Sequence, residues 1–375
     1  MTPLTLYRQA LERSELQEDP AQAALVARLD DLHRRLLVVT RDSASATGLW
    51  RKVLSVLTPA SASALASTDD ALRGLYIWGS VGRGKTLLVD LFFDALPFEN
   101  KLRIHFHDFM QHVHAELKLL GNRSDPLLEV AERLRVRAKV LCFDEFHVSD
   151  IADAMLLGRL FEALFDKGIV LVATSNSRPN ELYKNGLQRE RFVPAIKLIE
   201  LNTEVVELDS ATDYRLRALQ RESVYHSTLG DEANAAMERC YAELAPDAPV
   251  FAGTIRILSR DVPVRATAHG CVWFDFDVLC RGTRSASDYL ELAQVFHTLL
   301  LSGVPELNEA DNDAALRFMH LVDTLYDRNV NLVIEAQTQP DSLYCGQRLA
   351  ERFQRTRSRL EEMQSREYLA RAHLP

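Results

Sequence analysis

The chain has 375 residues, of which 47% are hydrophobic and 26% charged, so it can bury more than one apolar core and is not disordered as a whole. Its net charge of -9 disfavours partners that are recognised by phosphate charge alone, such as nucleic acid or an acidic lipid surface. The absence of a leader-like N-terminus, of an apolar run long enough to span a bilayer, and of paired cysteines favours a cytoplasmic protein without a membrane segment.

The first predicted region, residues 1–70, is an N-terminal helical segment. Residues 4–57 have the pattern of amphipathic helices, and Leu25, Leu29, Leu32 and Leu36 recur at helical spacing. Residues 58–70 then form a polar break. We therefore expect helices that pack one apolar side against a neighbour and end before residue 71.

The second region, residues 71–210, predicts an α/β core with a parallel sheet and flanking helices, because short apolar runs alternate with helical patterns. The connections are long enough for crossovers between parallel strands, and the helices are expected at 86–96 and 151–166. The predicted strands are 75–78, 102–106, 140–143, 169–173 and 204–208.

The third region, residues 211–375, predicts a second α/β unit with a helix at 231–244, strands up to residue 280 and helices from there to the C-terminus. Residues 160–183 align without gaps on residues 321–344, which indicates a degenerate repeat of the core. In that alignment Asp144 corresponds to Pro305 and Glu145 to Glu306, so the repeat would not hydrolyse nucleotide. The alternative is a chance likeness between two helix-strand-turn units.

A phosphate-binding loop follows the first predicted strand. The pattern G-x-x-x-x-G-K-[ST] lies between a strand and a helix, which is the context in which backbone N–H groups and the helix N-terminus bind polyphosphate. Its residues are Gly79, Ser80, Val81, Gly82, Arg83, Gly84, Lys85 and Thr86. We predict that Lys85 contacts the β and γ phosphates of ATP and that Thr86 offers its hydroxyl to Mg²⁺.

Two acids end the third predicted strand. Four apolar residues run directly into Asp144 and Glu145, where unpaired charge would be costly unless a cation is bound. We predict that Asp144 is the second protein anchor of Mg²⁺ and that Glu145 polarises the attacking water. The pair favours hydrolysis of ATP over a kinase reaction.

Further polar candidates follow the next strand. Asn176 is the candidate sensor of the γ-phosphate, and its alternative role is to cap the turn before Pro179. Arg191, and after it Arg189, are candidates for an arginine that acts in the site of a neighbouring subunit. The alternative is that both arginines are solvated helix charges.

Two other charged clusters are predicted to be structural. His105, His107, His112 and His114 lack a complete metal-ligand set, and His105 and His107 are expected to share one face of a strand. Four arginines follow helical spacing near the C-terminus, and we expect neighbouring acids to neutralise them. They are Arg348, Arg352, Arg355 and Arg359, and the acids are Glu351, Glu361 and Glu362.

The chain resembles the AAA+ ATPases and, within them, the ZapE-type bacterial cell-division ATPases with their mitochondrial relatives. The likeness covers nearly the whole length and is carried by several motifs besides the P-loop. They include the segments 74–79 (GLYIWG), 105–110 (HFHDFM), 141–146 (LCFDEF), 174–176 (TSN), 182–189 (LYKNGLQR), 213–217 (DYRLR) and 358–369 (SRLEEMQSREYL).

This resemblance implies an oligomeric ATPase at the division septum that destabilises filaments of the tubulin-like protein FtsZ. Two other functions stay open: a helicase-loader-like ATPase acting on nucleic acid, and a quality-control ATPase like the mitochondrial relatives. A protein in which ATP sets conformation only is a third, which Glu145 disfavours.

Overall fold

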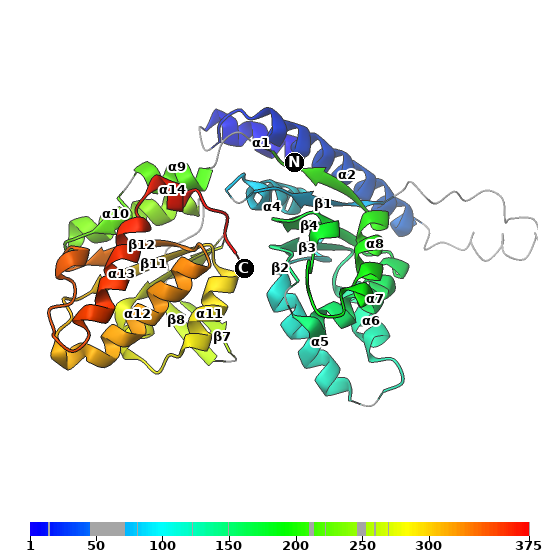
Figure 1. Ribbon diagram of the computed structural model, residues 1–375. Coiled ribbons are helices and arrows are strands. Elements are labelled where there is room, and N and C mark those ends of the chain that lie inside the picture. Colours follow the sequence, from blue (N-terminus) through cyan, green and yellow to red (C-terminus); the bar gives the residue numbers. More distant parts are fainter. Residues whose placement is uncertain are drawn as a thin grey trace, which may run out of the picture. The chain divides into compact units, whose positions relative to one another are not determined.

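The computed structural model describes residues 1–13, 16–45, 72–80, 82–121, 123–148, 150–209, 214–221, 223–245, 253–258, 260–268 and 270–374. The chain divides into two compact units, Met1–Thr212 (unit 1) and Asp213–Pro375 (unit 2). Each unit has its own sheet, as Figure 1 shows. Residues 46–57 and the polar break at 58–70 lie outside the described residues.

The sheet of unit 1 has five parallel strands in the order β2-β3-β4-β1-β5. The strands are β1 (Gly74–Trp78), β2 (Lys101–His105), β3 (Val140–Asp144), β4 (Val170–Ser175) and β5 (Thr203–Glu207). All five predicted strands are present, with bounds shifted by one or two residues. The consequence for function is that β4 lies between β1, which leads into the P-loop, and β3, which ends in the acid pair.

Helices cover both faces of this sheet (Figure 1). One face packs on the N-terminal helices and on the helix after the P-loop, which are α1 (Pro3–Glu12), α2 (Pro20–Ser45) and α4 (Lys85–Ala95). The other face packs on α5 (Phe106–Leu120), α6 (Pro126–Arg137), α7 (Ile151–Asp166) and α8 (Val193–Asn202). Two short 3-10 helices, η2 (Pro179–Glu181) and η3 (Arg189–Arg191), connect β4 to α8.

Local sequence explains several of these elements. The carboxylate of Asp150 caps α7 by accepting the backbone N–H of Ala152 at 2.6 Å and of Asp153 at 3.4 Å. The leucines predicted to recur along α2 are buried against α4 and the sheet. Because α2 covers the sheet beside α4, the N-terminal helices belong to the core of unit 1.

The main sheet of unit 2 has the order β6-β12-β11-β10-β9, and only β9 runs antiparallel to its neighbour. The strands are β6 (Tyr225–His226), β9 (Ala266–Ala268), β10 (Cys271–Asp275), β11 (Thr298–Val304) and β12 (Asn331–Ala336), and a separate hairpin joins β7 (Gly253–Ile257) to β8 (Arg260–Val264). The helices are α9 (Tyr214–Arg221), α10 (Asp231–Leu244), α11 (Ala286–Val295), α12 (Asn312–Asp327), α13 (Ala350–Glu362) and α14 (Arg366–Leu369). Three short helical segments complete it, namely η4 (Asp277–Arg281), η5 (Glu309–Asp311) and η6 (Pro340–Ser342).

The expectation of helices alone after residue 280 is wrong, because β11 and β12 are strands. Both are buried on two faces and consist of nearly continuous apolar residues. Such a run lacks the alternation that identifies a half-buried strand, so periodicity does not separate it from a buried helix segment.

The two sheets share a strand order. Read in the same direction, β10-β11-β12-β6 of unit 2 corresponds to β2-β3-β4-β1 of unit 1, and all of these strands are parallel. The elements α12, β12 and η6 begin and end 161 residues after α7, β4 and η2, as from Ile151 to Asn312. The aligned segments therefore hold the same helix, strand and 3-10 turn in the same place of each sheet.

Candidate active site

The P-loop connects the end of β1 to the start of α4 in a conformation that requires glycine. Gly84 precedes α4 with φ of 85°, in the left-handed region. A side chain on Gly79 would place its Cβ 2.4 Å from the carbonyl oxygen of Leu208. Val81, one of the predicted phosphate-binding residues, lies outside the described residues. Of the remaining seven, Lys85 and Thr86 begin α4 and the other five form the turn before it, as expected of a phosphate loop.

Lys85 points back into this turn. Its ammonium group donates hydrogen bonds to the carbonyl oxygens of Gly79 at 2.7 Å and Ser80 at 2.8 Å, and to Oδ1 of Asn176 at 3.0 Å. Asn176 follows β4, which is the neighbour of β1, so the sheet order brings the two side chains together. The structure thus places Asn176 beside the P-loop rather than only in a turn before Pro179.

Asp144 ends β3 at the same carboxyl edge of the sheet, and its side chain is 6% exposed. Its Oδ1 accepts a hydrogen bond from the Thr174 hydroxyl at 3.1 Å, and its Oδ2 accepts from the guanidinium of Arg103, with Nε at 3.1 Å. The carboxylate is therefore held from two neighbouring strands. In open α/β sheets this edge is where ligands bind.

Glu145 has a strained backbone, with φ of 51°, and its N–H donates to the Thr174 hydroxyl at 3.2 Å. A glutamate in the left-handed region is uncommon and is found where the surrounding structure requires it. Burial raises the pKa of Glu145 to about 7, and the charge of Asp144 adds to the rise while His105 and Lys85 oppose it. A carboxyl group with a pKa near neutrality is suited to act as a general base.

An aromatic cluster supports the acid pair from the opposite face of the sheet. Phe143 and Phe146, which flank the two acids, contact each other, and their rings pack on Phe106, Phe109 and Phe161. All five side chains are 2% exposed or less. The backbone that carries Asp144 and Glu145 is thus fixed by packing, which favours a preorganised site.

The two candidate arginines differ in their surroundings. The guanidinium of Arg189 donates a hydrogen bond to the carbonyl oxygen of Asn180 at 2.5 Å, so it already has a partner within the same chain. The side chain of Arg191 is exposed and makes no hydrogen bond or ion pair with any residue that the structure describes. Residues 188–191 line a pocket of about 370 Å³. The buried ring of Phe192, packed against Tyr183, anchors this segment.

Sequence reasoning missed three residues at this edge. Arg103 contacts Asp144, His105 lies close enough to Glu145 to affect its charge, and Gln22 of α2 donates to the carbonyl oxygen of Arg83 in the P-loop at 3.0 Å. In β2, Lys101, Arg103 and His105 alternate with Leu102 and Ile104. That alternation was a usable signal, because it predicts a polar strand face directed at a neighbour.

The histidine cluster is dispersed by the fold. Only His105 lies on β2, whereas His107 lies in α5, so the expectation that the two share a strand face is wrong. The chain turns from strand to helix at Phe106, whose ring is buried under β3. His114 pairs with Asp153 at 2.6 Å. Among the described residues no group of three or more His, Cys, Asp or Glu side chains forms a metal site.

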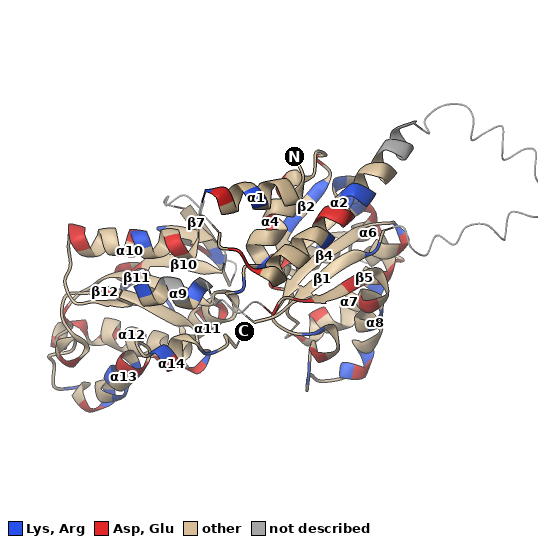
Figure 2. Cartoon of the chain, turned by 90° about the horizontal axis from the view of Figure 1, so that it is seen from above, with Lys and Arg blue, Asp and Glu red and all other residues tan. Residues whose placement is uncertain are grey.

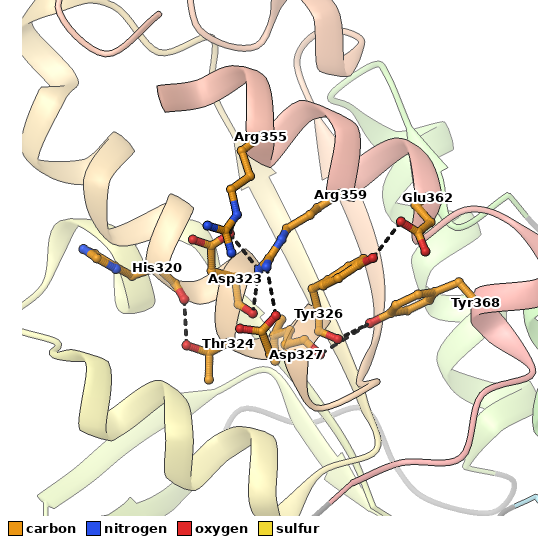
Figure 3. Close-up of polar contacts among 10 residues, drawn as sticks. His320, Asp323, Thr324, Tyr326, Asp327, Arg355, Arg359, Glu362 and Tyr368 are labelled. Atoms are coloured by element: carbon orange, nitrogen blue, oxygen red, sulfur yellow. Dashed lines mark hydrogen bonds and ion pairs between the residues drawn. The ribbon is translucent and has the colours of Figure 1, made fainter. Parts of the chain in front are cut away.

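Two of the four C-terminal arginines, Arg355 and Arg359, pair with acids of another helix, α12, rather than with the predicted neighbouring acids. Arg359 of α13 pairs with Asp323 at 2.8 Å and Asp327 at 2.9 Å and lies over the ring of Tyr326, as Figure 3 shows for the ion pairs. Arg355 lies 3.8 Å from Asp323. In the cartoon of Figure 2, basic and acidic residues are interspersed along α2 and α10. No helix of the described part has the length and apolarity needed to cross a bilayer.

Comparison with known proteins identifies the family. Residues 1–372 match the family of AFG1-like ATPases. The chain is 43% identical over 374 residues to "Cell division protein ZapE" of Escherichia coli K12, covering 100% of this chain and 99% of that protein. It is 35% identical over 342 residues to "Lactation elevated protein 1 homolog B" of Danio rerio, covering 79% of this chain and 68% of that protein. These matches confirm the predicted resemblance and the ATPase activity: the chain belongs to the AFG1-like ATPase family.

Proposed function

We propose that this ATPase hydrolyses ATP with Mg²⁺ at the carboxyl edge of the unit 1 sheet. Lys85 and the P-loop amides bind the phosphates, Thr86 and Asp144 hold the ion, Glu145 polarises the water, and Asn176 senses the γ-phosphate. One observation carries the proposal: three neighbouring strands end at the same edge of the sheet. The P-loop follows β1, the acid pair lies at the end of β3, and Asn176, whose amide oxygen accepts a hydrogen bond from Lys85, follows β4.

The residues present fit Mg²⁺. The candidate ligands are oxygen atoms, namely the hydroxyl of Thr86 and the carboxylate of Asp144. Among the described residues, no group of three or more His, Cys, Asp or Glu side chains could by itself hold a metal ion. Mg²⁺ is usually bound in this way, by one or two protein oxygens together with waters and substrate phosphates. When bound, the ion neutralises charge that develops on the transferred phosphoryl group.

Substitution of Asn176 tests the assignment. Asn176→Ala should keep ATP binding within about threefold and lower the hydrolysis rate by at least about tenfold, because one positioned polar contact is lost. Binding is measured with a non-hydrolysable ATP analogue and hydrolysis by phosphate release. Unchanged hydrolysis would leave Asn176 as a residue that merely packs against Lys85.

We propose that the active form is a homo-oligomer in which Arg191 acts on the nucleotide of a neighbouring subunit. Its exposure and the absence of a partner among the described residues support Arg191 over Arg189, which is already bonded to Asn180. In a subunit-mixing assay, Arg191→Ala protein should be inactive alone and should regain activity beside Lys85→Ala protein, which supplies the arginine. Full activity of Arg191→Ala alone contradicts the proposal.

We propose a role in bacterial cell division, in the cytoplasm and recruited to the septum, in which ATP turnover destabilises FtsZ filaments. The support is the similarity to the E. coli protein over the full length of both chains. Co-sedimentation with FtsZ filaments should depend on ATP, and hydrolysis should be stimulated by the filaments. Stimulation by single-stranded DNA instead would favour the helicase-loader alternative, and stimulation by unfolded substrate proteins would favour quality control.

We also propose that unit 2 is a non-hydrolysing repeat of the nucleotide-binding core. The shared strand order and the constant spacing of three successive elements support this. The start of α10 carries Asp231 and Glu232 where α4 carries Lys85 and Thr86. A chain with one functional site should bind one nucleotide.

A further inference from the structure

Arg103 occupies an unusual position for a basic residue of an α/β core. It lies on β2, beside β3, and its side chain is 17% exposed. In the strand register Arg103 lies opposite Cys142, and His105, two residues further along β2, lies opposite Asp144. A guanidinium there is close to the metal-binding edge but is not part of the P-loop or of the acid pair.

The guanidinium contacts two carboxylates from two different elements. Its Nε and Nη2 donate to Oδ2 of Asp144 on β3, and its Nη1 forms an ion pair with Asp90 on α4. Asp90 follows Thr86 by four residues, so the two side chains lie on one face of α4. Arg103 therefore joins the strand that carries one candidate Mg²⁺ ligand to the helix that carries the other.

We propose that Arg103 is a positioning residue that sets the spacing between Thr86 and Asp144 and thereby the contribution of Mg²⁺ to nucleotide affinity. This inference rests on the proposed Mg²⁺ dependence. Arg103 acts through Asp144 and Asp90 and does not itself touch the nucleotide. Asp144 keeps lone pairs for the metal or its water, because Thr174 and Arg103 use only part of its accepting capacity.

The chemistry of arginine suits this task. Its planar fork can hold one carboxylate by two N–H groups while a third N–H reaches another, whereas lysine offers a single ammonium centre. Groups that orient a metal ligand through hydrogen bonds typically change metal affinity by about 10- to 100-fold when they are removed. Arg103→Lys keeps the positive charge between the two acids and removes the fixed geometry, so it separates positioning from simple charge balance.

Unit 2 offers an internal comparison. Cys271–Asp275 pairs with Thr298–Ser302 as Lys101–His105 pairs with Val140–Asp144. Trp273 therefore corresponds to Arg103 and Ser302 to Asp144, so the alignment of Asp144 with Pro305 is wrong, because the ungapped match does not extend upstream into this strand. Nε1 of Trp273 donates to the Ser302 hydroxyl at 2.9 Å. The strand-to-strand hydrogen bond is thus present in both units, but only in unit 1 does it hold a carboxylate.

The test measures the affinity of ADP by calorimetry, in Mg²⁺ and in EDTA, for the full-length chain and its variants. The ratio of the two affinities is the Mg²⁺ enhancement. Arg103→Lys should lower this ratio by about tenfold and leave the Mg²⁺-free affinity within about twofold. Asp90→Asn, which removes the negative charge that Arg103 contacts on α4 but keeps the contact with Asp144, should lower the ratio less. Arg133→Lys, whose arginine pairs with Glu116 and Glu129 on the surface, is the matched control and should change neither affinity.

The outcomes are distinct. An unchanged enhancement in folded Arg103→Lys overturns the inference and leaves Arg103 as a structural ion pair. An absence of enhancement in the unsubstituted chain overturns both the inference and the proposed Mg²⁺ dependence. Thermal melting checks folding, and if Arg103→Lys does not fold, an unchanged enhancement in Asp90→Asn overturns the inference in its place.

Discussion

The carboxyl edges of the two sheets carry different side chains on one arrangement of strands. In unit 1, neighbouring strands present His105, Asp144, Thr174 and Ile77 in one row. The corresponding residues in unit 2 are the pair Asp275 and Ser302 and the pair Glu335 and His226, between which the register of β11 and β12 shifts after Leu301. Both sets lie on the face that packs on the helix following the first strand, α4 or α10. The scaffold alone therefore does not make a nucleotide site.

The helix starts explain the difference physically. The first turn of α10 contains Asp231 and Glu232, whose negative charges complement the positive end of the helix dipole. The first turn of α4 contains no acid and begins with Lys85. A cation at a helix N-terminus is unfavourable by itself, so α4 gains stability when an anion such as a phosphate binds there, whereas α10 does not need one.

At the corresponding edge of unit 2, polar side chains form hydrogen bonds and ion pairs with groups of the same unit. The Glu335 carboxylate accepts the N–H of Gly230, directly before α10, at 3.4 Å. Arg265 pairs with Asp275 at 2.8 Å and donates to Asn234 at 2.8 Å. A phosphate placed at this edge would meet carboxylates rather than a lysine. The difference leads us to expect that the identity of the edge side chains, and not the fold, decides whether such a sheet binds nucleotide.

The largest expected effect is that of Lys85→Ala. If unit 2 binds no nucleotide, the unsubstituted chain should bind one nucleotide, and Lys85→Ala should bind none at measurable affinity. Hydrolysis by Lys85→Ala should be reduced by at least about 10²-fold. Calorimetry with an ATP analogue gives the stoichiometry. Lys167→Ala, which removes an ion pair with Glu132 in the same unit, is the control. A second nucleotide that survives in Lys85→Ala would contradict the comparison.

Glu145→Gln should lower hydrolysis by about 10²- to 10⁴-fold, because the general base is lost, while binding of ATP is kept. Glu306→Gln changes the acid that the ungapped sequence alignment places at Glu145, although the strand register places Gly303 there, and it should leave hydrolysis unchanged. Phosphate release and nucleotide binding are measured for both variants. Equal losses in the two variants would show that the acid position in unit 2 is also active.

The pH dependence should follow Glu145. With its pKa raised by burial to about 7, the carboxylate is present above that pH, so kcat/KM should fall about tenfold per pH unit below it. A profile that stays flat down to pH 5 would contradict this assignment.

The stability of the fold should change with pH in the opposite direction to the activity. Because the pKa of Glu145 in the folded chain exceeds the unfolded value of 4.5, Glu145 destabilises the fold as pH rises from 4.5 through 7. Glu145→Gln should therefore raise the melting temperature at pH 8 relative to the unsubstituted chain.

The smallest expected effect is in unit 2. Trp273→Phe removes the hydrogen bond to Ser302 inside the core and should lower the free energy of unfolding by about 1–3 kcal/mol, with ATPase activity within about twofold. Melting curves of Trp273→Phe, Ser302→Ala and the double variant measure the coupling of the pair. A loss of hydrolysis as large as that of Lys85→Ala would mean that unit 2 also takes part in the reaction.

The residues of the candidate site can be proposed from the sequence because the motifs that contain them are local. A P-loop is eight consecutive residues, and the acid pair is defined by the strand that precedes it, so both are found without knowledge of the sheet order. Helix α7 was predicted with its observed bounds because its cap and its apolar spacing lie within one segment. Strands β11 and β12 were missed because strands buried on both faces show no alternation.

Arg103 and Thr174 could not be assigned to Asp144 in advance, since their contacts depend on which strands are neighbours. The order β2-β3-β4-β1 is set by packing of whole helices on both faces of the sheet, and no short segment encodes it. The amino-acid sequence by itself determined the phosphate loop, the acids and the family. Only the tertiary structure decided that Asn176 contacts Lys85, that Arg103 bridges β3 to α4, and that a second sheet of the same strand order carries different side chains at its edge. The reason is that contacts between strands distant in sequence form only after the sheet is assembled.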